Sequence, residues 1–394
     1  MERACLLALG TAALAGGRPV HEVESELVRV GAALGVADVR CAATPTGLFV
    51  AIGEGDTGFR PVGPPLRFDQ AAALSAVRER VLAHELGPAE AIAAVDAVIR
   101  QPPRIPRLVA AAGLLPVGAG LALILQPAPA NVLFALLCSV LVAALIELAG
   151  RSPLLTTLLP VVAAFSVGCI IFAAAEGDLL EGPLRTLLPP IAVLLPGALI
   201  VTGMSELAAG AMVAGTARLV FGTVQLLLFT FGVLAAARVV GTETAELANV
   251  RVDELGPWAA WAGLALVGVG VFLNVSAPRG ALPWMLGLLA LTFLAQTGGQ
   301  EAYGAPVGAF LGGLVAALGA AVVGRFDGPP TLVVFLPSFW LLVPGSLGLV
   351  SVTQLAAASG GGFETATAAA GVIVAIALGV LTGSALGRAV HARG

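Results

Sequence analysis

The sequence predicts a mainly α, polytopic membrane protein with ten transmembrane helices in two inverted five-helix repeats, preceded by a small cytoplasmic α/β domain. Apolar residues make up 58% of the chain and charged residues 11%, whereas soluble domains hold about 45–50% and about 25%. From Leu108 onward the chain is a series of apolar runs of about twenty residues, the length that crosses about 30 Å of hydrocarbon. A Pro-Gly segment also recurs at a fixed offset in two of these runs.

Residues 1–107 are expected to form the cytoplasmic α/β domain and its linker. Met1–Ala15 resembles a weak signal peptide, but Glu2 lies in the n-region and no Ala-x-Ala cleavage site follows, so a helix is the better interpretation. Three prolines make residues 101–107 a stiff, non-helical linker. The expected elements are helices over 2–15, 19–34, 69–86 and 88–100 and strands over 37–44 and 47–53.

The apolar runs divide the membrane region into two halves, residues 108–241 and 242–394. An offset of 148 residues carries the starts of the first five runs to within a few residues of the starts of the last five. Because five is odd, the second half must enter the membrane from the opposite side, and the halves form an inverted repeat. The predicted spans are 108–126, 130–149, 154–175, 184–205, 217–240, 257–277, 281–297, 303–324, 330–351 and 366–388.

The arginines at the ends of these spans predict the orientation. If residues 1–107 are cytoplasmic, nine arginines lie at inner ends and three at outer ends, which follows the positive-inside rule. We therefore expect a multi-pass protein of the plasma (inner) membrane with both termini cytoplasmic. The inner arginines are Arg100, Arg104, Arg107, Arg151, Arg218, Arg279, Arg325, Arg388 and Arg393; the outer ones are Arg185, Arg238 and Arg251.

The matched Pro-Gly segments, 196–209 and 344–357, are the strongest indication of a binding site. Proline disfavours helix at the preceding residue and frees carbonyls in the preceding turn, so a new half-helix can begin there. Its first N–H groups then have no partner and attract a carboxylate. Corresponding breaks in two halves of a membrane chain point to a transporter site. The predicted substrate-binding residues here are Pro196, Gly197, Ala198, Pro344, Gly345 and Ser346, with ordinary kinked helices as the alternative.

Nearby polar side chains extend this candidate site. The hydroxyl groups of Thr202, Ser346, Ser351 and Thr353 can bond a substrate, or each can cap a local carbonyl. Arg218 opens the fifth span, where it can pair with Glu206, bind a substrate carboxylate or anchor the helix at the inner surface. We include Thr202 and Arg218 among the substrate-binding residues.

Two carboxylates in or near spans, Glu206 and Glu147, are candidates for proton coupling, because acidic residues within membranes usually mark a pathway or relay. Glu206 lies ten residues past Pro196, which places it near the cytoplasmic face of a straight helix. Its counterpart in the second half is the non-titrating Gln354. Surface anchoring is the alternative role for both carboxylates.

The remaining composition excludes several classes of function. A net charge of −4 argues against a nucleic-acid partner, and the four cysteines show no metal-ligand spacing. No Ser-His-Asp order and no phosphate loop is present, so we expect no enzyme, cofactor or metal. A membrane-anchored enzyme with a small site at Glu24, Thr44 and Thr46 is the alternative from another class. The expected partners are a small-molecule substrate, protons and the lipid bilayer, and homo-oligomerisation stays open.

Four features resemble the threonine/serine exporter family: a charged N-terminal helix, a Thr-Pro turn, the first Pro-Gly segment and an Ala-Arg after it. The ten-span layout behind a soluble domain is also similar. This resemblance implies proton-coupled export of small hydroxy amino acids by antiport. A related two-protein arrangement is associated with succinate export, so a dicarboxylate is the alternative substrate. The residues are Val23-Glu24 before Leu34-Gly35, Thr44-Pro45-Thr46-Gly47, Leu195-Pro196-Gly197-Ala198-Leu199 with Gly203 and Glu206, and Gly215-x-Ala217-Arg218.

Overall fold

The computed structural model describes residues 1–243, 247, 250–325, 329–342, 344–356 and 362–392, without the side chains of 332, 344–348, 362–365 and 390–392. Within that part the chain is mainly helical. Seven helical stretches are long and apolar enough to cross a membrane, or up to eight if one sharply bent pair counts as a span. The seven are Arg107–Leu125, α7 (Pro129–Ala149), α8 (Pro153–Glu176), α11 (Met212–Val240), α13 (Ala281–Tyr303), α14 (Ala305–Val323) and Ala366–Ala389 within α17 (Gly362–Ala392).

Large apolar side chains lie exposed along several of these stretches. On α7 they include Leu133, Leu137 and Val140, and on α11 they include Val224 and Leu227. Their spacing of three or four residues forms one stripe per helix. Apolar stripes on that scale are stable where lipid, rather than water, covers them. A multi-pass membrane protein accounts for both the length of the helices and their exposed faces.

The N-terminal residues form four helices and a three-stranded antiparallel sheet in the order β1-β2-β3. The predicted helices and the first two strands are confirmed, with ends shifted by a few residues. His84 adopts a left-handed conformation at φ 60°, which ends α3 at Leu82 rather than at residue 86. The third strand was not predicted, since it has only four residues and begins with glycine and ends with proline. The elements are α1 (Glu2–Ala15), α2 (Val20–Ala33), β1 (Val39–Thr44), β2 (Gly47–Ile52), β3 (Gly58–Pro61), α3 (Phe68–Leu82) and α4 (Pro88–Arg100).

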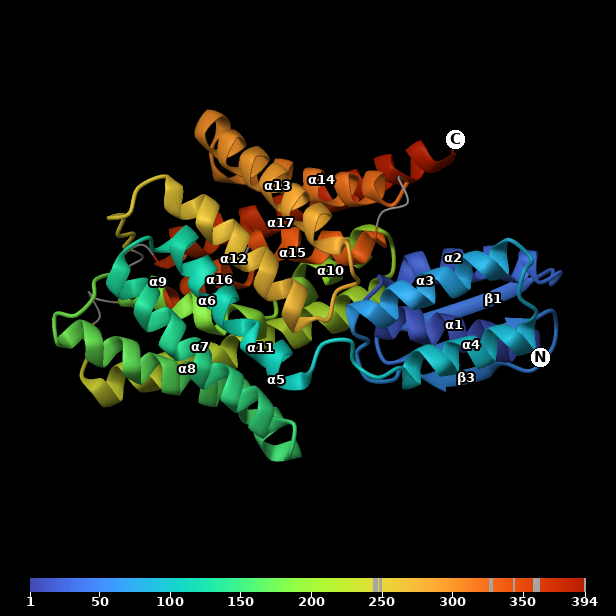
Figure 1. Cartoon of the computed structure of the whole chain (residues 1–394), viewed down its shortest axis with the longest axis horizontal. Helices are drawn as coiled ribbons and strands as arrows, with labels where there is room; N and C mark the ends of the chain where they lie inside the picture. The colour runs from blue at the N-terminus through green and yellow to red at the C-terminus, as the bar shows by residue number, and fades with distance from the viewer. Residues whose placement is uncertain (244–246, 248–249, 326–328, 343, 357–361, 393–394) are drawn as a thin grey trace.

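These N-terminal elements share one hydrophobic core. The side chains of Leu48 and Val50 alternate along β2 with exposed Phe49, so one face of the sheet packs on helices. Val23, Leu27 and Val30 on α2 meet the same core at helical spacing. Figure 1 shows α1–α4 and the strands gathered at one end of the molecule, with the long apolar helices at the other.

The end of α4 and the first residue of the linker are held by polar contacts from residues 67 and 70. The Arg67 guanidinium pairs with Asp69 at 3.0 Å and donates to the Gln101 carbonyl at 2.9 Å. Gln70 donates to the carbonyls of Val98 and Ile99. The predicted span 108–126 begins directly after this linker as two short helices, α5 (Arg107–Ala112) and α6 (Leu114–Leu125), joined at Gly113.

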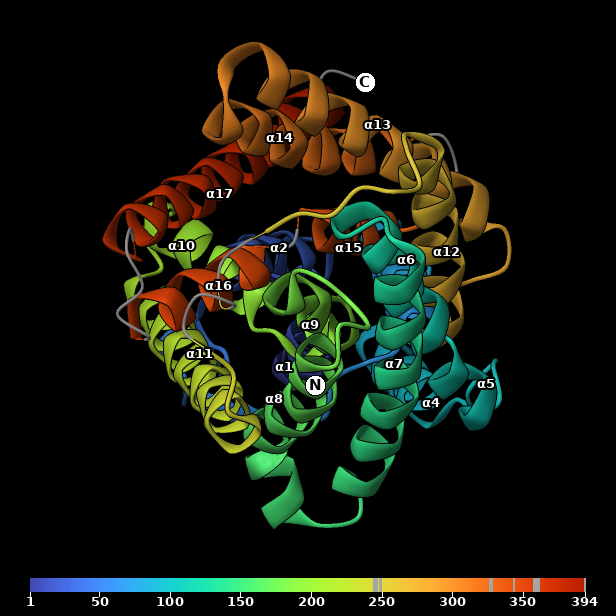
Figure 2. The same cartoon turned by 90° about the vertical axis from the view of Figure 1, so that its left-hand side faces the viewer.

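Glycines set the close packing between membrane helices. A Cβ atom on Gly120 would lie 2.6 Å from the Gly263 carbonyl, where α6 crosses α12 (Trp258–Asn274). On α17, Cβ atoms at Gly383 and Gly387 would meet α14 at 2.6 Å. Because only glycine permits such a close approach, the helix axes can lie nearer to each other at these positions. Figure 2 shows the resulting layout, with α13, α14 and α17 along one side and α7, α8 and α11 along the other.

Two of the predicted spans are broken helices. The predicted run 184–205 comprises α9 (Pro183–Ile191), the 3₁₀ turn η1 (Ala192–Leu194) and α10 (Gly197–Ala208), with a bend of 66°. The predicted run 330–351 comprises α15 (Thr331–Leu341) and α16 (Pro344–Ala356). Both second pieces begin at the Pro-Gly segments, as the sequence predicts. Between α10, which ends at Ala208, and α11, which begins at Met212, the chain makes a short turn at residues 209–211.

Candidate functional site

The first Pro-Gly break has the geometry that proline imposes. Leu195 is extended, with φ −67° and ψ 139°, and buried Pro196 is the N-cap of α10. The first N–H groups of a helix have no intrahelical acceptor, which applies here to Gly197, Ala198 and Leu199. Gly197 is buried, so this helix end faces the protein interior. It offers backbone donors and partial positive charge to an anion.

The second break carries buried hydroxyl groups downstream. Pro344, Gly345 and Ser346 open α16, but their side chains lie outside the described part of the structure. Ser351 and Thr353 further along α16 are buried. Among the described residues, the Thr353 hydroxyl has no hydrogen-bond partner, and the same holds for Thr230 on the neighbouring α11. Thr202 on α10 is half-buried.

Glu206 and Arg218 form an ion pair between α10 and α11. The Arg218 Nε donates to Glu206 Oε2 at 3.0 Å, and the side chains are 14% and 0% exposed. Glycines make this possible, because a Cβ atom on Gly203 would lie 2.9 Å from the carbonyl of Gly215. The two helices therefore approach closely at Gly203 and Gly215, each three residues before a member of the ion pair in the sequence. Of the roles open to Arg218, the structure has the one in which it pairs with Glu206.

The second oxygen of Glu206 contacts the N-terminal region, which sequence reasoning missed. The backbone N–H of Val20 donates to Glu206 Oε1 at 2.9 Å in a buried contact. Val20 is the first residue of α2, so this N–H has no intrahelical acceptor and the helix end attracts negative charge. The two residues are 186 positions apart, and no local pattern in the sequence connects them.

Glu147 has a different environment from Glu206. It lies in the last turn of α7 and pairs with the Arg107 Nε at 2.8 Å. Its side chain is 32% exposed and that of Arg107 is 70% exposed. An exposed pair of this kind contributes about 0–1 kcal/mol. The contact ties the C-terminal end of α7 to the start of the first span.

The residues of the alternative enzyme site are engaged in local structure. Glu24 Oε1 accepts the Ala43 N–H at 2.8 Å and so links α2 to β1. The Thr44 hydroxyl donates to the Gly47 carbonyl at 3.1 Å within the turn. The described residues contain no group of three His, Cys, Asp or Glu that could hold a metal ion.

A polar network that the sequence did not indicate stabilises the far end of the helical region, opposite the N-terminal elements. Gln126, fully buried, donates to the carbonyls of Glu181 and Val250. Asn131 donates to Thr186 at 2.6 Å and to the Glu181 carbonyl at 2.7 Å. These bonds join the loops 126–129, 177–182 and 250–257.

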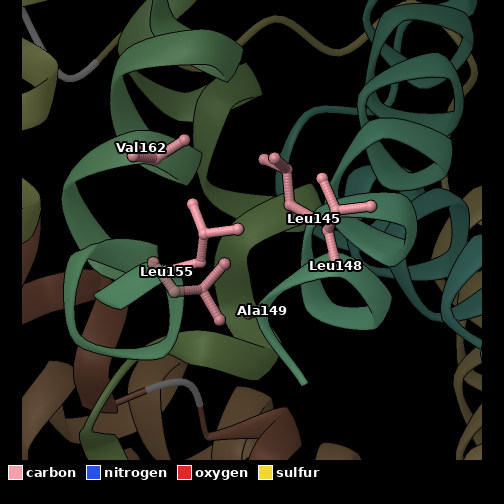
Figure 3. Close-up of a pocket in the computed structure, with 6 residues that line it drawn as sticks. Leu145, Leu148, Ala149, Leu155 and Val162 are labelled. Carbon is pink, nitrogen blue, oxygen red and sulfur yellow. The ribbon is translucent and has the colours of Figure 1, made fainter. Parts of the chain in front are cut away.

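A small crevice between α7 and α8 has the wrong chemistry for a polar substrate. Figure 3 shows its side chains, which are all aliphatic and come from only these two helices. Such a surface fits a hydrocarbon chain rather than an amino acid. The lining residues are Leu145, Leu148, Ala149, Leu155, Leu159 and Val162.

Comparison with known proteins identifies the family. Residues 4–240 match the family model described as "Putative threonine/serine exporter". The match includes the N-terminal elements, the first Pro-Gly break, Glu206 and Arg218, whereas residues 241–394 lie outside it. No curated protein and no solved structure matches the chain. Since the model covers more than half of the sequence, the chain belongs to the threonine/serine exporter family.

Proposed function

We propose that this protein exports threonine or serine across the plasma (inner) membrane by proton antiport. The family match carries this proposal, because it extends from the N-terminal elements through the broken helix α9–α10 to the end of α11. A buried helix end with free N–H groups recognises the carboxylate that all amino acids share. A hydroxyl such as that of Thr353 recognises the side-chain hydroxyl that threonine and serine add.

The proposal includes an architecture of ten spans in two inverted repeats, residues 108–241 and 242–394, which follow a cytoplasmic domain of residues 1–107. Two corresponding helix breaks support it. The contacts of Glu206 and its counterpart Gln354 support it as well. Glu206 bonds to the N-terminal region, whereas Gln354 donates to the Leu247 carbonyl in the loop region that follows α11. Corresponding residues at opposite ends are what an in-plane two-fold axis produces.

In this proposal the substrate carboxylate binds between the two half-helix starts, at Pro196, Gly197 and Ala198 and at Pro344, Gly345 and Ser346. Thr202 contributes a hydroxyl on α10, and Arg218, paired with Glu206, lies along the inner part of the path. Helix ends bind an anion without burying a fixed counter-charge, so the site can also release it. This property suits a transporter, which must bind its substrate on one side of the membrane and release it on the other.

Glu206 is the proposed proton carrier, with Glu147 as the next candidate. The Glu206 carboxylate is fully buried and accepts hydrogen bonds from two donors, so a proton on it would remove the acceptor of Arg218 or of Val20. Protonation and helix contacts are therefore coupled at one side chain. A residue that only anchored the surface would not need this burial.

Counterflow in proteoliposomes tests the function. Vesicles preloaded with unlabelled serine or threonine should accumulate the labelled amino acid, and vesicles preloaded with succinate should not. An imposed pH gradient should drive net accumulation in the wild type. Glu206→Gln should retain exchange and lose gradient-driven accumulation, since only the titrating group is removed. Accumulation by Glu206→Gln would assign coupling elsewhere, and counterflow of succinate alone would replace the substrate class.

A further inference from the structure

The N-terminal elements contact both halves of the helical region. On the first half, Val20 donates to Glu206, and Ala214 of α11 lies within the N-terminal hydrophobic core. On the second half, the Phe68 N–H donates to the Val275 carbonyl at 3.0 Å. Glu22 also lies 3.8 Å from the Arg388 guanidinium near the end of α17.

These contacts come from one unit with a shared core. Buried residues of α1, α2, α3, α4 and β2 form a single cluster, whereas buried Phe68 at the start of α3 packs in a cluster of the helical region. Glu26 on α2 bonds to Arg78 on α3 at 3.1 Å, so the helices that carry Val20 and Phe68 are also joined by charge. A displacement at one contact is therefore transmitted to the others rather than absorbed within the domain.

Glu206 links this unit to the proposed binding site. It lies on α10, the half-helix that starts at Gly197, so any shift of that helix moves the carboxylate. Arg218 holds the same carboxylate against α11. The N-terminus of α2 is thus connected to both α10 and α11 through the Glu206 side chain.

We infer that the N-terminal domain is a clamp: it bridges the two halves in this conformation, and the first turn of α2 must leave Glu206 before the halves can rearrange. This inference rests on the proposed transport function, because alternating access requires one repeat to move against the other. The clamp contacts are Val20–Glu206, Phe68–Val275 and Glu22–Arg388.

Val20→Pro isolates the first clamp contact. Proline is favoured at the first position of a helix and removes the N–H, which here donates to Glu206 and not to the helix. Pro19 is already extended, with ψ 143°, as a residue before proline must be. Val20→Ala is the matched control, because it shortens the same buried side chain and keeps the N–H.

Hydrogen exchange at Phe68 reports release at a distance. Phe68 is the first residue of α3, so its amide is protected by the Val275 carbonyl of the other domain and not by its own helix. In the full-length protein in nanodiscs, Val20→Pro should speed exchange of the peptide containing Phe68 by about tenfold relative to Val20→Ala, the effect of losing one hydrogen bond to a charged group. Both variants should elute as the wild type does.

Arg388→Ala provides a second, independent release, since its side chain is 60% exposed and its loss does not disturb a core. Arg80→Ala is its control, because Arg80 pairs with Glu85 inside the N-terminal region. We expect faster Phe68 exchange and faster serine counterflow in Arg388→Ala than in Arg80→Ala. Equal Phe68 exchange in each matched pair overturns the clamp. Absence of counterflow in the wild type would instead reject the transport function and leave the exchange result standing.

Discussion

At the residue scale, the buried charge of Glu206 depends on its partner Arg218. Arg218→Ala leaves a carboxylate without its counter-charge in a fully buried position, which costs about 3–5 kcal/mol of stability. Adding Glu206→Gln should recover most of the loss, because the amide can still accept the Val20 N–H without carrying charge. Thermal unfolding of the single and double variants measures this. Additive losses would show that the two side chains do not interact in the folded protein.

Cys41 on β1 gives a second prediction at this scale, through its pKa. Burial, and next the Glu24 carboxylate, raise the pKa of the Cys41 thiol from 9.0 to about 11. Because only the thiolate is alkylated, iodoacetamide should modify Cys41 about a hundredfold more slowly in the folded than in the unfolded chain at pH 8. The folded pKa is the higher one, so the stability linked to this thiol is present below pH 9 and is lost as pH rises toward 11. Peptide mass spectrometry measures the rates, and equal rates would contradict the shift.

At the element scale, the two half-helix starts should be equivalent. Gly197→Leu and Gly345→Leu are each expected to abolish counterflow while the protein stays in the membrane, because a side chain there blocks approach to the free N–H groups. Gly287→Leu on α13 is the control, since a Cβ atom at that position meets nothing within 4 Å. Counterflow at the wild-type rate in either variant would exclude that helix end from substrate binding.

Helix packing gives a prediction for stability rather than transport. Gly120→Ala should destabilise the protein by about 1–3 kcal/mol, the usual cost of overpacking, because its Cβ would lie 2.6 Å from the Gly263 carbonyl of α12. Gly287→Ala should be neutral or stabilising, since its methyl group enters open space and alanine favours helix. The apparent unfolding midpoints in detergent provide the comparison. A stable Gly120→Ala variant would mean that α6 and α12 do not pack this closely.

At the scale of the whole molecule, the proposed inverted repeat makes a labelling prediction in both halves. Single cysteines at exposed Leu179 and Tyr303 should react with a membrane-impermeant maleimide in intact cells. In the proposed topology Ser152 and Arg279 face the cytoplasm, so cysteines at these positions should react only after lysis. Glu147 near the first turn pairs with Arg107, and Val275 near the second accepts the Phe68 N–H. The native cysteines are first replaced. Labelling of Ser152 or Arg279 variants in intact cells would overturn the topology.

The sequence by itself determined the features that depend on neighbouring residues. The helix breaks at Pro196 and Pro344 follow from the missing N–H and fixed ring of proline, and the structure has both. Apolar runs also predict membrane stretches, but of the ten predicted spans the described residues show seven long enough to cross, or up to eight with the bent pair. Local backbone chemistry acts over a few residues, so a pattern in the sequence is enough to reveal it.

Only the tertiary structure decided which distant groups meet. The sequence offered three roles for Arg218, and the close approach of Gly203 to Gly215 selected the pair with Glu206. The sequence does not indicate that Glu206 accepts the Val20 N–H, because that contact requires α2 to be packed against the end of α10. Buried polar groups must find partners wherever the fold brings donors and acceptors together. The physical reason is that such partners are chosen by packing in three dimensions and not by spacing along the chain.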